Sequence, residues 1–151
     1  MVLNESISIL QKPEKIWEFW LLVSTDIQWR EGFIKAEWTS RPPHGVGSTG
    51  VHTHKDLGAM PWTILKWEEG SYFEFIHDRE SKLKGSVASY RVQPENEGSR
   101  VSLHARIVGP FFMRIISIFM RAKMIQGLQG DLQKLKKIME IPSPDQEGKL
   151  K

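Results

Sequence analysis

Six consecutive segments in the middle of the chain follow a period of two, with one clearly apolar face in all but residues 48–55, and one long helical segment follows them. The segments span residues 34–39, 48–55, 62–67, 71–78, 84–92 and 100–108. This period of two predicts strands, and the alternation directs Ile34, Ala36, Trp38 and Leu65 inward. Short links rich in glycine, proline and polar residues favour antiparallel hairpins. A sheet of this size must bury one face, and the segment 110–140 is long enough to cover it.

The region before the sheet predicts one further strand and two short helices. Residues 6–10 alternate apolar and polar side chains, which is typical of a strand. Pro13 suits the first turn of a helix that runs to Leu21, and residues 24–26 can cap a second short helix. The expected fold is therefore α+β, with a curved antiparallel sheet of about seven strands wrapped around the C-terminal helix. We expect one domain over residues 1–141 and a disordered tail over 142–151.

The long helical segment carries apolar residues on two faces. One stripe runs along its whole length and contains Ile118, Ile125, Leu128, Leu132, Leu135 and Met139. A second apolar face lies roughly opposite, in the first half alone, and contains Phe112, Ile115, Ile116 and Phe119. Because a helix that covers a sheet needs one apolar face, the second must meet a ligand cavity, a partner chain or a membrane. Asp131 is expected at the surface of this helix.

Composition excludes several classes of protein. The chain of 151 residues has no cysteine, so disulfides and thiolate chemistry are excluded and a reducing compartment is favoured. A net charge of +3 without a basic cluster argues against nucleic-acid binding. The apolar runs are shorter than the roughly 20 residues of an integral membrane segment, and the N-terminus lacks the pattern of a signal peptide. The expected location is cytoplasmic.

Six segments, in this order and spacing, resemble a known superfamily. They are Ile9–Phe19, His44–Ser48, Trp62–Glu68 followed by Phe73–Phe75, Gly98–Ser102, and Asp131–Lys136. Together they resemble the START-like superfamily (SRPBCC) with its helix-grip fold, which includes the polyketide cyclase/dehydrase and lipid-transport group. The resemblance implies a deep, mostly apolar pocket between sheet and helix that binds a small hydrophobic molecule. It implies no shared catalytic motif.

Candidate residues for such a pocket come from the sheet and the long helix. The chain has six tryptophans, and aromatic residues fill cores as well as line cavities. Projecting inward from central strands, the candidates for the wall are Trp38, Trp67, Phe75 and Tyr90, with the polar pair His52 and His54. The second helical face supplies a pocket gate or, as the alternative, a dimer contact. The candidate ligand-binding residues of the long helical segment are Phe112, Ile116 and Met120.

Two motifs match the residue patterns of known binding sites but lack the surrounding sequence that those sites need. Residues 45–50, GVGSTG, match a dinucleotide fingerprint, but two prolines precede them and a strand pattern follows where that motif needs a helix. His52 and His54 share a strand face and could bind a metal with His77 or His104. No acidic partner is evident on that face, so they are interpreted as polar residues of the pocket wall or surface. We expect no metal and no cofactor.

Three functions follow from these observations. The first is a non-catalytic carrier or sensor of a lipid-like or aromatic molecule. The second is a cyclase- or dehydratase-type enzyme for a polyketide-like substrate, using Tyr90 with His52, His54 or His77 as acid or base. The third is an interaction module that dimerises through Phe112, Ile115 and Phe119. Convergent titratable groups in an open pocket favour the enzyme, an apolar cavity favours the carrier, and a filled core favours the interaction module.

Overall fold

The computed structural model describes residues 1–109 and 113–141, with residues 113–117 described in their backbone alone. The first strand and the short helices are β1 (Val2–Ile9), α1 (Pro13–Leu21), a 3-10 turn (Val23–Thr25) and α2 (Asp26–Trp29). The remaining elements are β2 (Phe33–Trp38), β3 (Thr49–His54), β4 (Gly58–Glu68), β5 (Tyr72–His77), β6 (Val87–Glu95), β7 (Gly98–Arg106) and α3 (Met113–Met139). The predicted order of elements is confirmed, whereas the predicted tail 142–151 and Phe112 lie outside the described residues.

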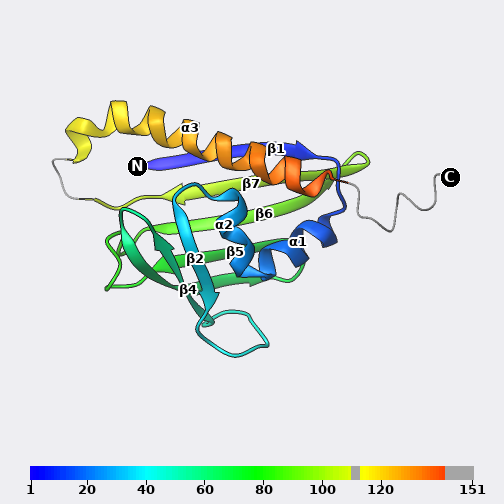
Figure 1. Ribbon diagram of the computed structural model, residues 1–151, viewed down its shortest axis with the longest axis horizontal. Helices are drawn as coiled ribbons and strands as arrows, with labels where there is room; N and C mark the ends of the chain where they lie inside the picture. The colour runs from blue at the N-terminus through cyan, green and yellow to red at the C-terminus, as the bar shows by residue number, and fades with distance from the viewer. Residues whose placement is uncertain (110–112, 142–151) are drawn as a thin grey trace.

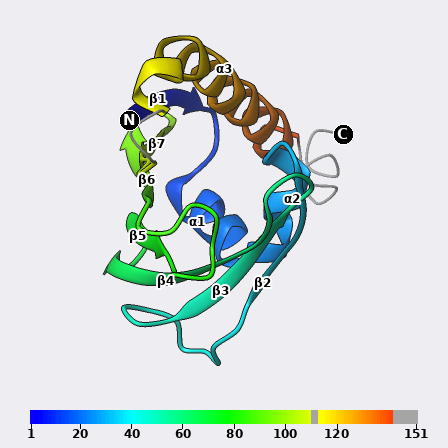
Figure 2. The same cartoon turned by 90° about the vertical axis from the view of Figure 1, so that its left-hand side faces the viewer.

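The strands form one antiparallel sheet that curls into a half-barrel. Their order is β1-β7-β6-β5-β4-β3-β2, so sequential hairpins build most of the sheet and β1 returns to pair with β7. Figure 2 shows the sheet curving around α1, with α3 above β1 and reaching toward α2. Figure 1 shows α3 running lengthwise beside β1. This is the helix-grip arrangement that the sequence predicts.

The short helix α1 fills one end of the half-barrel. It begins at Pro13, with Glu14 in its first turn near the positive end of the helix dipole. Ile16, Trp17 and Trp20 share its buried face. Trp20 packs edge-on against Phe73 of β5 and Tyr90 of β6, at ring-centroid distances of 6.1 and 5.4 Å. These large side chains leave little free space at this end of the sheet.

Among the described side chains of the long helix, the buried ones lie in its C-terminal half. Leu132, Leu135 and Met139 are buried, and Leu128 is partly buried against the same core. The predicted stripe does not continue to the start of the helix, because Ile118 is 77% exposed. The expectation that the stripe holds α3 against the sheet along most of its length is therefore wrong. The middle of α3, from Lys123 to Asp131, borders an open space.

Two β-bulges reverse the predicted direction of two side chains. The alternation directs Ile34 and Leu65 inward, yet they are 62% and 41% exposed. The pairing register shifts between Phe33 and Lys35, and again between Ile64 and Lys66. An extra residue in one strand changes which face the following side chains occupy. Phe33 and Ile64 therefore contribute the inward side chains.

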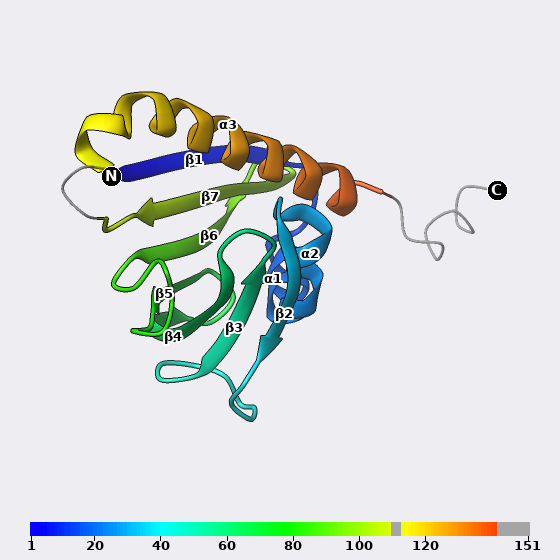
Figure 3. The same ribbon diagram turned by 60° about the vertical axis from the view of Figure 1, so that its left-hand side comes forward.

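Within residues 1–109 and 113–141, no helix combines the length and apolar character that crossing a membrane requires. Figure 3 shows α3 lying along β1, with the rest of the sheet curving from β7 round to β2.

Candidate functional site

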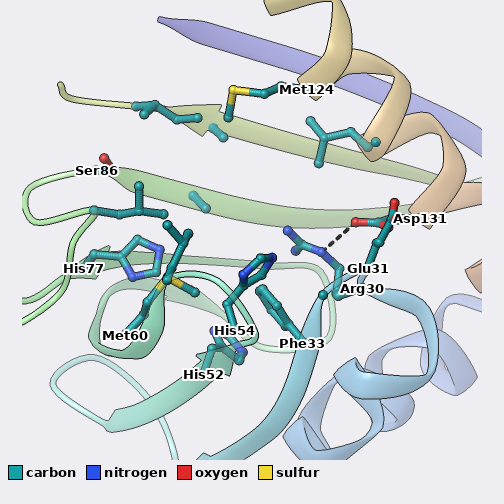
Figure 4. Close-up of a pocket in the computed structure, with 18 of the residues that line it drawn as sticks. Arg30, Glu31, Phe33, His52, His54, Met60, His77, Ser86, Met124 and Asp131 are labelled. Carbon is teal, nitrogen blue, oxygen red and sulfur yellow. Dashed lines mark hydrogen bonds and ion pairs between the residues drawn. The ribbon is translucent and has the colours of Figure 1, made fainter. Parts of the chain in front are cut away.

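A cavity of about 460 Å³ lies between the sheet and α3. Met60 and Phe75 line it from β4 and β5, and Met124 and Leu128 line it from α3 (Figure 4). Further apolar lining comes from Leu3, Phe33, Leu57, Leu83, Val87, Ala88, Ala105 and Ile107. Small-molecule sites commonly enclose about 300–1,000 Å³ behind mostly apolar walls with a few polar groups. The cavity therefore has the size and the lining of a ligand site.

One of two glycines in α3 contributes to the open space. Gly127 lines the cavity, and a Cβ atom added there would meet no atom within 4 Å. Gly130 is exposed and equally unobstructed. Glycine in a helix interior costs about 1 kcal/mol relative to alanine, so two of them within four residues were a signal in the sequence. That signal marks the part of α3 where the backbone itself forms the cavity wall.

An ion pair joins α2 to α3 at one end of the cavity. The Nε of Arg30 donates a hydrogen bond to Oδ2 of Asp131 at 3.0 Å, and the backbone N–H of Glu31 donates to Oδ1 at 3.0 Å. The Nη1 of Arg30 donates to the phenol oxygen of Tyr90 on β6. Asp131 is 6% exposed, so its expected place at the surface is wrong. A residue dismissed from the sequence is thus one of the charged groups of the cavity wall.

Aromatic rings surround the guanidinium of Arg30. Its Cζ atom lies 5.2, 5.1 and 5.7 Å from the ring centroids of Trp29, Phe33 and Tyr90. Cation–π contacts of this kind favour a desolvated arginine. Burial raises the pKa of Asp131, while Arg30 and the Glu31 amide oppose that shift. Burial also raises the pKa of Tyr90, so its phenol keeps its proton at neutral pH.

His52 is held by an acidic partner from a distant part of the chain. Its Nε2 lies 2.9 Å from Oδ2 of Asp26, and Oδ1 of Asp26 accepts from the indole of Trp29 at 3.2 Å. Because a carboxylate accepts, Nε2 carries the hydrogen, and in the neutral ring Nδ1 is then the acceptor. The acidic partner lies on α2 and not on the strand, so the sequence pattern of the strand does not reveal it.

Two further imidazoles line the cavity. Burial, followed by the nearby His52 and Arg30, lowers the pKa of His77 to about 4, so its ring is neutral at neutral pH. His54 accepts a hydrogen bond from the Asp56 backbone at 3.1 Å. A Cβ atom at Gly32 would lie 2.2 Å from Nε2 of His54, and the φ of Gly32 is +81°. Both the close approach and the left-handed backbone require glycine beside this ring.

The described part of the chain contains no group of three or more His, Asp or Glu side chains placed to bind a metal ion. His52 and His54 both line the cavity from β3, but their hydrogen bonds go to Asp26 and to the Asp56 backbone. The geometry of these two residues therefore favours the interpretation as polar groups of the wall.

The residues of the sheet that are predicted to bind ligand divide into two groups. His52, His54 and Phe75 line the cavity. Trp38, Trp67 and Tyr90 lie outside its described lining: Trp38 donates to the Leu21 carbonyl at 2.9 Å, Trp67 donates to Glu69 at 2.7 Å, and Tyr90 binds Arg30. Their role in binding stays a prediction.

The predicted gate belongs to the start of α3. Met120 is partly exposed and lies outside the described lining of the cavity. Ile116 is described in its backbone alone, and Phe112 lies outside the described residues. The gate therefore also stays a prediction. Sequence reasoning missed Arg30, Met60 and Met124, whose roles depend on contacts between distant elements.

The family model described as polyketide cyclase / dehydrase and lipid transport matches residues 2–140. The chain belongs to this family. The predicted resemblance is thereby confirmed, since the family is part of the superfamily named from the sequence. A search of curated proteins gives no match.

Solved structures share the fold of this family member at low sequence identity. The Aha1 dimer from Colwellia psychrerythraea is 18% identical, with 93% of this chain and 97% of that chain covered and a TM-score of 0.68. TTHA0849 from Thermus thermophilus is 16% identical, with 91% and 95% covered and a TM-score of 0.72. The di-domain ARO/CYC StfQ from the steffimycin biosynthetic pathway is 12% identical, with 92% and 50% covered and a TM-score of 0.71. At these identities the likeness concerns the fold.

Proposed function

We propose that this protein binds a small hydrophobic molecule, lipid-like or aromatic, in the cavity and acts as its carrier or sensor. The observation that carries the proposal is the cavity of about 460 Å³ between sheet and α3, whose lining is mostly apolar. Burying an apolar ligand there removes apolar surface of both ligand and protein from water, which favours binding by roughly 25 cal/mol per Å². The family description, which includes lipid transport, supports the same function.

The state of the polar groups supports binding over catalysis. Arg30 pairs with Asp131, and His52 pairs with Asp26, so these polar groups already have partners. With a pKa lowered to about 4, His77 is a weak base at neutral pH. Such groups can orient a polar atom of a ligand through hydrogen bonds without exchanging protons with it.

A cyclase- or dehydratase-type enzyme is the second candidate, and the three histidines of the cavity favour it. His52, His54 and His77 line one space, which is the convergence of titratable groups that an enzyme needs. The contact of His52 with Asp26 also resembles a base oriented by a carboxylate. If this function holds, a poly-β-ketone model substrate is dehydrated or cyclised, and His52→Gln abolishes turnover while retaining binding. If the protein is a carrier, the model substrate is recovered chemically unchanged after incubation with it.

The two glycines of α3 provide a matched test of binding. Gly127→Leu places a side chain into the cavity, whereas Gly130→Leu makes the same change at an exposed position of the same helix. Both substitutions improve helix propensity, so both variants should remain folded. We expect Nile red to bind wild type and Gly130→Leu with equal affinity, and Gly127→Leu at least about tenfold more weakly, by fluorescence titration. Equal binding by all three proteins would refute the cavity as the site.

Homodimerisation remains a separate prediction that concerns the start of α3. Ile118 and Phe119 are 77% and 86% exposed, which is unusual for large apolar side chains. The similar Aha1 protein from Colwellia psychrerythraea is described as a dimer. Light scattering coupled to size-exclusion chromatography should show a dimer for wild type and a monomer for Phe119→Asp. A monomeric wild type would refute this prediction and leave the proposed ligand binding untouched.

A further inference from the structure

The guanidinium of Arg30 has hydrogen-bond capacity left over at the cavity. It has five N–H donors in a fixed plane, of which one goes to Asp131 and one to Tyr90. Among the described residues, the other three have no protein acceptor. Arg30 lines the cavity, and Figure 4 shows its guanidinium beside Asp131 in the space below α3. A ligand oxygen that reaches this end of the cavity therefore meets free donors.

The positive charge of Arg30, in contrast, is already compensated. Asp131 contacts it at 3.0 Å, and the two side chains are only 18% and 8% exposed. The second buried carboxylate, Asp26, lies behind His52. A ligand carboxylate would have to lose its water shell beside these two carboxylates, with Arg30 as the one buried cation of the described network.

The exposed part of the lining adds no excess of positive charge. Lys55 and Lys123 are exposed lining residues, and so are Glu31 and Asp56. Exposed charges of this kind are screened by water and salt, and here the two signs balance. His77 is buried and neutral, so it offers a hydrogen bond without a charge.

From this geometry we propose that the cavity selects an uncharged molecule whose carbonyl, ether or hydroxyl oxygen accepts a hydrogen bond from Arg30. The free carboxylate of a fatty acid or an aromatic acid is rejected. Arg30 supplies the donors, Asp131 fixes the guanidinium and cancels its charge, and the apolar walls hold the body of the ligand. This inference rests on the proposed binding function and names the class of molecule that the same site prefers.

Two probes with the same body and different head groups test the proposal. Naphthyl methyl ketone and naphthoate differ mainly in charge, and quenching of tryptophan fluorescence reports the binding of each. At pH 7.5 we expect wild type to bind the ketone at least about tenfold more tightly than the carboxylate. Arg30→Lys keeps the positive charge and loses the planar donors, so ketone affinity should fall about three- to tenfold.

Asp131→Asn separates charge from shape. The asparagine amide has one acceptor oxygen where the carboxylate has two, so it keeps the hydrogen bond from Arg30 or the one from Glu31, and the arginine charge is no longer cancelled. Naphthoate affinity should therefore rise at least about tenfold, with the ketone changed less than about threefold. Glu37→Gln makes the same change of net charge at an exposed ion pair on β2 and should alter neither affinity.

The outcomes separate this inference from the proposed function. If wild type binds naphthoate as tightly as the ketone, or if Asp131→Asn gains no naphthoate affinity while remaining folded by circular dichroism, the selection of uncharged ligands is refuted. If neither probe binds and Gly127→Leu has no effect on Nile red, the binding function itself fails.

Discussion

The two halves of the interior use the same sheet in opposite ways. At the α1 end, Ile16, Trp20 and Leu135 are at most 1% exposed, and the space left among the aromatic rings there is about 10 Å³. Beneath the middle of α3, the sheet borders a cavity of about 460 Å³. One end is filled by tryptophans from a short helix, and the other is left open by glycines and lined by methionines and histidines.

This difference shows that the fold alone does not determine where the cavity lies. The sheet curls enough to leave an interior along its whole length, and side-chain volume decides which part is filled. Trp17 and Trp20 occupy the volume at one end, whereas Gly127 leaves it empty at the other. Substitutions at the two ends should therefore differ in their effects on stability and on binding.

The largest effect is expected in the filled end. Trp20→Ala removes a side chain that is 1% exposed and contacts the rings of Phe73 and Tyr90. The resulting hole should lower the free energy of unfolding by about 3–5 kcal/mol, as for other large aromatic residues in cores. Urea denaturation followed by circular dichroism measures this change. A loss below about 1 kcal/mol would mean that this end is not tightly packed.

An intermediate effect is expected from His77 in the cavity wall, as a function of pH. Its pKa is about 4 in the folded protein against 6.5 as the ordinary value. The unfolded chain therefore binds a proton below pH 6.5 that the folded protein does not bind until about pH 4. Stability should fall over this range by roughly 3 kcal/mol and then level off. His77→Gln should lack this component in denaturation curves measured from about pH 7.5 to 4. An unchanged pH dependence in the variant would contradict the shifted pKa.

The smallest effect is expected at Met124, which faces the cavity from α3. Its side chain already borders empty space, so Met124→Ala removes few contacts and enlarges an existing cavity. The free energy of unfolding should fall by less than about 1 kcal/mol, compared with the roughly 2–5 kcal/mol usual for methionine in a filled core. The same urea denaturation measures it, and Met139→Ala in the filled end is the control. Equal losses at both methionines would remove the distinction between the two ends.

The sequence predicts the helices and strands and their order well, because these depend on local periodicity. The alternation in the six middle segments and the proline at the start of α1 identify the elements and their order. The sequence predicts the direction of individual side chains less well. A separate register shift turns Ile34 and Leu65 outward, and the local sequence pattern gives no sign of either shift. Side-chain direction at such points depends on the partner strand.

The candidate site is harder to predict because its members come from distant parts of the chain. His52, His54 and Phe75 can be named from the alternation, and they line the cavity. The Arg30–Asp131 pair joins residues that are 101 positions apart, and Asp26 is the partner of a strand histidine. The tryptophans are poor predictors of the cavity wall because large side chains fill space. Trp38 and Trp67 pack beside other groups, while smaller residues leave the cavity open.

The most direct test of a ligand site between sheet and helix uses the methyl groups of methionine. Met60 lines the cavity from β4, Met124 lines it from α3, and Met139 is buried in the filled end. Carbon-13 methyl labelling and titration with naphthyl methyl ketone follow all three in one spectrum. We expect the Met60 and Met124 signals to shift together and saturate, with Met139 unchanged. Saturable binding that leaves both Met60 and Met124 unshifted would contradict the account.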